Sequence, residues 1–242
     1  MTLRSRQVQR PHHPIGLRSE HVAEFERLLW VEPKYDPTSS DEYKIKYDSD
    51  DSTLITVTGT KYSDRRVREF RDASGLPMFE AQRSRTLWKN KPWRIRLPGN
   101  VKEDLADVKP SGWLQNFNLT FRNALAQDAK NNDDKMVTLE VRRSSALCEF
   151  GVWTSGHRKV ADIRESMERN RISSSLSMMA SGKGGYFSPP RAIMEVLVAD
   201  GFDFSIASLC AIIICDAYFR PTPPTQIEIR ELEKRLNPKM VS

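Results

Sequence analysis

Residues 198–219 read VADGFDFSIASLCAIIICDAYF, and no charged residue stands between Asp203 and Asp216. A helix built from this run is apolar on every face, so it must be surrounded either by lipid or by protein. Its uncharged core, residues 204–215, would rise roughly 18 Å, whereas the hydrocarbon core of a bilayer is about 30 Å thick. We therefore predict a helix over residues 202–219 that is buried inside the protein.

Short apolar or alternating runs separated by turn signals precede this segment and predict strands. The clearest turn is Asp72-Ala73-Ser74-Gly75, because Asp72 can bond the backbone two residues on and Gly75 can take a positive φ. A mostly β chain with one apolar helix near its end hides its apolar surface best when the sheet closes around the helix. The sequence therefore predicts a mainly β fold, a closed antiparallel β-barrel around a central hydrophobic C-terminal α-helix. The expected strands lie at residues 43–47, 54–59, 67–71, 77–83, 93–97, 117–122, 136–142, 148–154, 159–164 and 193–198.

The barrel is expected to span residues 43–219, with a segment of different character on each side. Residues 1–42 are basic and contain prolines without strand-like alternation, which predicts a partly disordered leader. In it, Ser19 is expected to cap a short helix with apolar positions at Val22, Phe25, Leu28 and Leu29. Residues 173–190, rich in Ser, Met and Gly, predict a long loop. Residues 220–242 predict a proline-rich linker and a short amphipathic tail helix.

Composition favours an intracellular protein without catalytic chemistry. The chain of 242 residues carries 38 Lys and Arg against 32 Asp and Glu, a net charge of +6, and it has only 3 cysteines. The polar N-terminal sequence and the few cysteines disfavour secretion, so a cytoplasmic protein is expected, peripheral to the membrane or nuclear. No paired nucleophile and base and no metal-ligand spacing is found, so no catalytic residue, metal or cofactor is predicted. Cys210 and Cys215 are expected to be core side chains.

Two acidic residues bracket the apolar helix, and both are predicted to be structural. Asp203 lies near the helix N-terminus, where the helix dipole favours a negative charge and the first backbone amides need a cap. Asp216 lies near the other end, where the dipole gives no such help. Asp216 must therefore find a hydrogen-bond donor elsewhere in the protein or in water.

Three stretches resemble the LURP-one-related proteins, especially the fungal members. They are RDASGLPMFE at residues 71–80 followed by KPWRIRLPG at 91–99, KVADIR at 159–164, and VADGFD at 198–203. This family is part of the tubby C-terminal-like superfamily, which also includes phospholipid scramblases. The resemblance implies a twelve-stranded barrel threaded by a central hydrophobic helix. It also implies structural roles for Trp93, which leads a strand, and for Gly201, which precedes the helix.

A basic region is the best functional lead. Between Lys61 and Lys102 there are 12 Lys or Arg and 4 Asp or Glu, a local charge of 12 − 4 = +8. On a strand, Arg83 and Arg85 share one face, and so do Arg94 and Arg96. Such cations can attract anionic phospholipid headgroups or nucleic-acid phosphates, although a solvated barrel exterior has the same composition. The candidate lipid-binding residues are Arg83, Arg85, Lys89, Lys91, Arg94 and Arg96.

Tubby-like proteins bind phosphoinositides through a basic face, so the resemblance favours lipid over nucleic acid. The sequence therefore predicts a non-enzymatic interaction module that binds anionic phospholipid, phosphoinositide in particular. Two alternatives stay open. One is a protein-interaction scaffold whose leader or tail contacts an unidentified protein partner, and the other is a tubby-like factor that binds nucleic acid and is associated with transcription.

Overall fold

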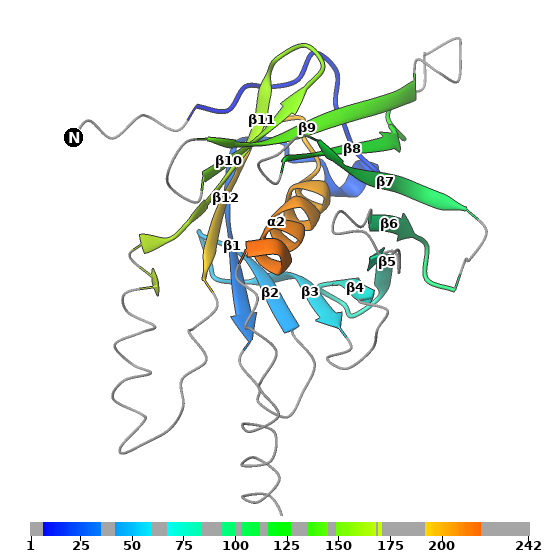
Figure 1. Ribbon diagram of the computed structural model, residues 1–242. Coiled ribbons are helices and arrows are strands. Elements are labelled where there is room, and N and C mark those ends of the chain that lie inside the picture. Colours follow the sequence, from blue (N-terminus) through cyan, green and yellow to red (C-terminus); the bar gives the residue numbers. More distant parts are fainter. Residues whose placement is uncertain are drawn as a thin grey trace, which may run out of the picture.

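The computed structural model describes residues 7–34, 42–59, 67–83, 93–99, 103–111, 116–126, 135–144, 149–167, 169–170 and 192–218. Its strands form one closed antiparallel barrel in the order β1-β12-β11-β10-β9-β8-β7-β6-β5-β4-β3-β2 (Figure 1). This confirms the predicted mainly β fold, a closed barrel with one C-terminal helix. The strands are β1 (Arg27–Lys34), β2 (Glu42–Tyr47), β3 (Thr53–Gly59), β4 (Val67–Asp72), β5 (Pro77–Arg83), β6 (Trp93–Arg96), β7 (Asp104–Ser111), β8 (Asn116–Arg122), β9 (Met136–Ser144), β10 (Glu149–Thr154), β11 (Lys159–Glu165) and β12 (Met194–Val198).

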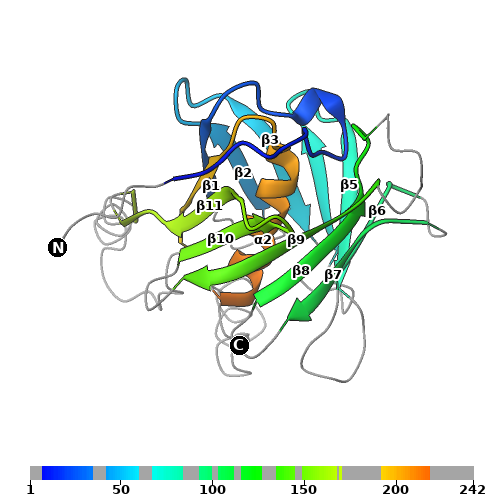
Figure 2. The ribbon, with the colours of Figure 1, turned by 90° about the horizontal axis from the view of Figure 1, so that it is seen from above.

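Helix α2 (Phe204–Tyr218) runs through the ring of strands, as the view from above shows (Figure 2). Every side chain from Ser205 to Cys215 is buried, and the inward side chains of the strands, such as Phe70, Phe121 and Phe150, belong to the same core. Burial raises the pKa of the Cys210 thiol to about 12, so this cysteine serves as a core side chain. Among the described residues, no helix has the length and hydropathy needed to cross a membrane.

The two ends of the barrel differ in what they carry. We call the end at which α2 begins the upper end and the end at which α2 finishes the lower end. Because all neighbouring strands are antiparallel, alternate connections meet at the same end. The connections β2–β3, β4–β5, β6–β7, β8–β9 and β10–β11 therefore lie at the upper end.

Strand β1 corrects the predicted leader. It lies within residues 1–42, yet it pairs with both β12 and β2 and so closes the barrel. Leu29 and Val31 are fully buried. The barrel therefore begins before residue 43, and the expected helix from Ser19 is only a three-residue 3-10 turn, η1 (Ser19–His21). The apolar run at residues 28–31 is too short for its periodicity to separate helix from strand, and pairing on both sides decides for strand.

Residues 9–23 form a strap that closes the upper end, instead of the poorly packed leader that was predicted. The Ile15 amide donates to the Gly201 carbonyl at 2.9 Å, and the Ala23 amide donates to the Phe202 carbonyl at 3.0 Å. Ile15 and Ala23 are buried. The strap thus fixes the chain just before α2. The predicted loop at 173–190 and the predicted tail at 220–242 lie outside the described residues.

Candidate functional site

The predicted basic cluster is only partly described. Arg85, Lys89 and Lys91 lie outside the described residues, whereas Arg83 ends β5 and Arg94 and Arg96 lie in β6. The strand register then separates these three arginines into two groups.

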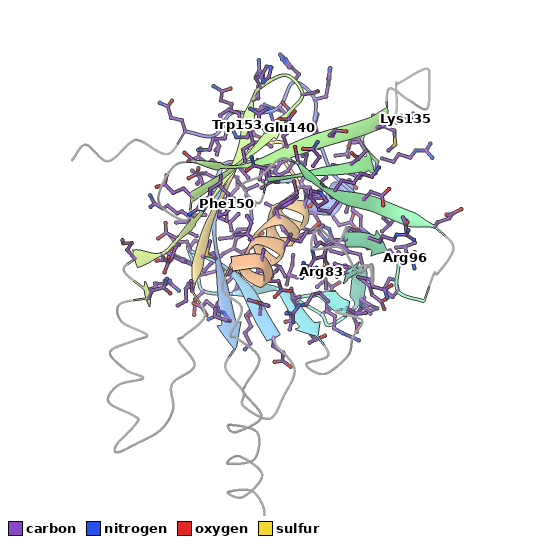
Figure 3. The ribbon with its side chains drawn as sticks, viewed as in Figure 1. Arg83, Arg96, Lys135, Glu140, Phe150 and Trp153 are labelled. Carbon is purple, nitrogen blue, oxygen red and sulfur yellow. The ribbon has the colours of Figure 1, made fainter. Side chains whose placement is uncertain are left out.

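Arg83 lies on the opposite face of the sheet from Arg94 and Arg96. In the register of β5 with β6, Arg83 stands opposite Trp93, and Ala81 stands opposite Ile95. Directly opposed residues share a face, and the Trp93 and Ile95 side chains belong to the core. Arg83 therefore faces the interior side, while Arg94 and Arg96 face outward. Figure 3 shows Arg83 toward the middle of the molecule and Arg96 at its outer edge.

Carboxylates accompany the two outward arginines. The Arg96 Nε lies 2.5 Å from Asp104 Oδ1, and the Arg94 Nε lies 3.9 Å from Asp104 Oδ2. The Arg94 side chain is nevertheless 52% exposed, against 17% for Arg96. Arg94 therefore presents its charge to solvent, whereas Arg96 is largely engaged with its neighbour.

The structure extends the outward cations along the upper end of the barrel, beyond the segment that the sequence indicated. Arg71 is the next-to-last residue of β4, Arg122 is the last residue of β8, and Lys135 immediately precedes β9. Arg96 and Lys135 lie on the same side of the molecule (Figure 3). We call this surface the hairpin rim: the upper ends of the hairpins β4–β5, β6–β7 and β8–β9, together with the outer face of β6 that leads up to them. Its described cations are Arg71, Arg94, Arg96, Arg122 and Lys135.

Carboxylates of the hairpin rim have local partners. Asp72 Oδ1 accepts bonds from the Ser74 amide at 2.9 Å, the Ser74 hydroxyl at 2.7 Å and the Leu76 amide at 2.9 Å. These bonds lower the pKa of Asp72. Gly75 has a φ of 85°, a conformation that favours glycine, as the β4–β5 turn requires at this position. With its pKa lowered, Asp72 stays charged but is engaged within its own turn. Asp104 pairs with Arg96, and Glu69 pairs with Arg71, whose Nη2 lies 2.5 Å from Glu69 Oε1. The Arg71 and Arg94 side chains remain 40% and 52% exposed. Counting charges along the sequence did not reveal the rim, because its three hairpins are far apart along the chain.

Asp203 caps the start of α2. Its Oδ1 accepts bonds from the Ser205 amide at 2.7 Å and the Ser205 hydroxyl at 2.6 Å, and its Oδ2 accepts one from the Leu17 amide of the strap at 2.9 Å. Burial raises the pKa of the Asp203 carboxyl, and the hydrogen bonds act in the opposite direction. Gly201 has a φ of 79° and lies against Pro11 of the strap. Both residues position the helix.

Asp216 binds Arg68 at the lower end. The Arg68 Nε donates to Oδ2 at 2.8 Å, Nη2 donates to Oδ1 at 2.6 Å, and the Tyr43 hydroxyl donates to Oδ1 at 3.1 Å. The Arg68 and Asp216 side chains are only 8% and 6% exposed. Arg68 was counted with the basic region, but its charge is neutralised inside the barrel. Its partner could not be found from the sequence, because the two residues are 148 positions apart.

Among the described residues, a metal site would need clustered ligand side chains, and a reactive thiol would need access to solvent. No group of three or more His, Cys, Asp or Glu side chains lies close enough there to hold a metal ion. The described thiols, Cys210 and Cys215, are both buried.

Comparisons with known proteins agree with this architecture. The family model described as LURP-one-related matches residues 27–216. The crystal structure of an Arabidopsis thaliana protein, AT5G01750, is similar with a TM-score of 0.51 at 17% sequence identity, over 84% of this chain and 98% of that chain. No curated protein matches the sequence. The family model begins at Arg27, the first residue of β1, and ends at Asp216, the acid bound by Arg68. The chain therefore belongs to the LURP-one-related family.

Proposed function

We propose that this protein is a non-enzymatic interaction module that binds anionic phospholipid headgroups, phosphoinositides in particular, through the cations of the hairpin rim. The observation that carries the proposal is the row of outward cations Arg71, Arg96 and Arg122 at the upper ends of three consecutive hairpins, with the exposed Arg94 on the same face of β6 as Arg96. Such a row can meet a flat anionic surface with several cations at once. Each cation near an anionic membrane surface contributes about 1 kcal/mol.

The proposed lipid site differs in its residues from the site predicted from the sequence. Arg94 and Arg96 stay in it, and Arg83 is left out because it faces the interior side of β5. Arg85, Lys89 and Lys91 lie outside the described residues, so they are not assigned to the rim. Buried Arg68 is also excluded, since Asp216 neutralises it.

Cosedimentation with vesicles tests the proposal. The purified full chain is mixed with vesicles of phosphatidylcholine alone, or containing phosphatidylserine or phosphatidylinositol bisphosphate, at low and high salt. We expect pelleting that requires anionic lipid, is stronger for phosphatidylinositol bisphosphate, and weakens at high salt. Competing DNA separates lipid from nucleic acid, because nonspecific DNA binding follows charge alone.

A matched pair of charge variants locates the site. The rim variant carries Arg71→Gln, Arg94→Gln and Arg122→Gln. The control carries Lys44→Gln, Lys109→Gln and Arg142→Gln, three outward positions nearer the lower end, and loses the same net charge. We expect the rim variant to bind roughly a hundredfold more weakly, about 3 kcal/mol, and the control to change little.

Two results would overturn the proposal. Equal loss in the rim variant and the control would mean that net charge, and not the rim, governs binding. Failure of the native chain to pellet with any anionic vesicle would remove lipid as the partner and return attention to a protein-interaction scaffold.

A further inference from the structure

Exposed apolar side chains gather at the upper end of the barrel. Five large hydrophobic side chains are exposed in the described residues, and four of them lie at this end: Phe25, Leu76, Leu97 and Met136. The fifth, Met167, follows β11 at the lower end. Isolated exposed hydrophobic residues are ordinary, but here three consecutive hairpins each carry one.

Each of these three hairpin residues stands beside a cation. Arg71 Nη1 donates to the Gly75 carbonyl at 2.8 Å, which places it next to Leu76 in the same turn. Leu97 follows Arg96 directly in the chain, and Arg96 is paired with Asp104. Met136 stands opposite Arg122 in the register of β8 with β9. The unit of one exposed apolar side chain with an adjacent cation thus occurs three times along the rim.

The rest of the upper end has a different character near β1 to β3. The β2–β3 turn exposes Asp48, Asp50 and Asp51, and Phe25 stands between exposed Glu24 and Glu26. The Phe25 ring is also engaged, because the Arg27 guanidinium lies 4.2 Å from its centroid. The three hairpins carry acids too, but these have partners: Glu69 pairs with Arg71, Asp104 pairs with Arg96, and Asp72 is bonded within its turn. An anionic surface is therefore better tolerated over the three hairpins, whose described cations include Arg94 and Arg122, than over Phe25.

We propose that Leu76, Leu97 and Met136 insert into the interface of an anionic bilayer while the neighbouring cations contact headgroups. This inference rests on the proposed function and adds the depth and orientation of binding. A bilayer fits the surface because apolar side chains flanked by cations are the arrangement that interfacial membrane binding uses. Solitary side chains on separate hairpins do not form the contiguous, well-packed centre that a protein interface needs.

Site-directed labelling tests the insertion. Single cysteines are introduced as Leu76→Cys, Leu97→Cys and Met136→Cys in a Cys148→Ser background, since Cys210 and Cys215 are buried. Each thiol carries a polarity-sensitive fluorophore, and its emission is recorded with phosphatidylcholine vesicles and with vesicles containing phosphatidylinositol bisphosphate. We expect a blue shift at all three positions with the anionic vesicles only.

Two further positions serve as controls. Met167→Cys is exposed at the lower end, and Phe25→Cys is exposed at the upper end beside the acids. We expect no shift at either position. A shift at Met167 equal to those on the hairpins would overturn the proposed orientation, and a shift at Phe25 would overturn the division of the upper end.

The labelling experiment distinguishes a failure of the proposed lipid binding from a failure of the proposed insertion. If the labelled proteins cosediment with anionic vesicles but positions 76, 97 and 136 show no shift, the insertion is wrong and the electrostatic binding stands. If they do not cosediment, the proposed function itself fails.

A second measurement does not depend on labels. The variant Leu76→Ser, Leu97→Ser, Met136→Ser is compared with Met167→Ser at a salt concentration that screens the cations. We expect the triple variant to bind at least about tenfold more weakly and Met167→Ser to bind as the native chain does. Unchanged thermal unfolding of both variants shows that the fold is kept, and native binding by the triple variant would overturn the insertion.

Discussion

The two ends of α2 each hold a buried acid, but the acids are satisfied in different ways. At the start, Asp203 accepts bonds from nearby backbone amides and from Ser205, two residues on. At the finish, Asp216 is held by Arg68 of β4 and Tyr43 of β2. A helix start exposes amide donors, whereas a helix finish exposes carbonyl oxygens that repel a carboxylate. The lower acid therefore needs a cation from a distant strand, and the upper acid does not.

This contrast predicts that the largest loss of stability comes from Arg68. Arg68→Leu would leave the Asp216 carboxylate buried without its cation, which costs about 3–5 kcal/mol of unfolding free energy. Urea denaturation of the full chain measures the loss.

The matched control is the double variant Arg68→Leu with Asp216→Leu. Removing both charges should recover most of the loss, since a buried ion pair and an apolar pair of similar volume have similar stability. A double variant no more stable than Arg68→Leu alone would mean that Arg68 acts by packing instead of by neutralising Asp216.

Asp203→Ala should cost less, about 2–3 kcal/mol, because it removes a helix cap and leaves buried amide donors unsatisfied. The Leu17 amide loses its acceptor as well, so the strap should open more often. Hydrogen exchange at Leu17 therefore measures an effect that Arg68→Leu should not produce.

The conservative variant Asp203→Asn is the control at this end. An asparagine keeps an acceptor oxygen and is itself a good cap, so it should retain most of the stability. Equal losses for Asp203→Ala and Asp203→Asn would contradict the capping role and point to the charge itself.

The sequence predicted what depends on local pattern. The uncharged run between Asp203 and Asp216 predicted the buried helix, and alternating runs predicted most strands, because burial on one or all faces leaves a direct mark on residue order. Two strands were missed, β1 and β7. Strand β1 was missed because the run at residues 28–31 fits either period, and strand β7 was missed because its charged residues and Pro110 hide the alternation of its apolar positions.

The candidate site was less predictable, because faces and neighbours depend on register. Arg83 and Arg94 are close in sequence and were grouped, yet β5 and β6 place them on opposite faces. Arg122 lies outside the counted basic region, and only the antiparallel order of the barrel brings it to the end that carries Arg71 and Arg96. A charge count along the chain carries neither kind of information.

The smallest effect expected at the lower end is that of Tyr43→Phe. The Tyr43 hydroxyl donates to the same Asp216 oxygen that accepts from Arg68 Nη2, and its bond is longer, 3.1 Å against 2.6 Å. Its removal leaves both arginine bonds in place, so the loss should be about 1 kcal/mol in urea denaturation. In the background of Arg68→Leu with Asp216→Leu the hydroxyl has lost this acceptor, and the same substitution should cost clearly less. An equal cost in both backgrounds would show that Tyr43 stabilises the barrel independently of Asp216, and the lower acid would then depend on Arg68 alone.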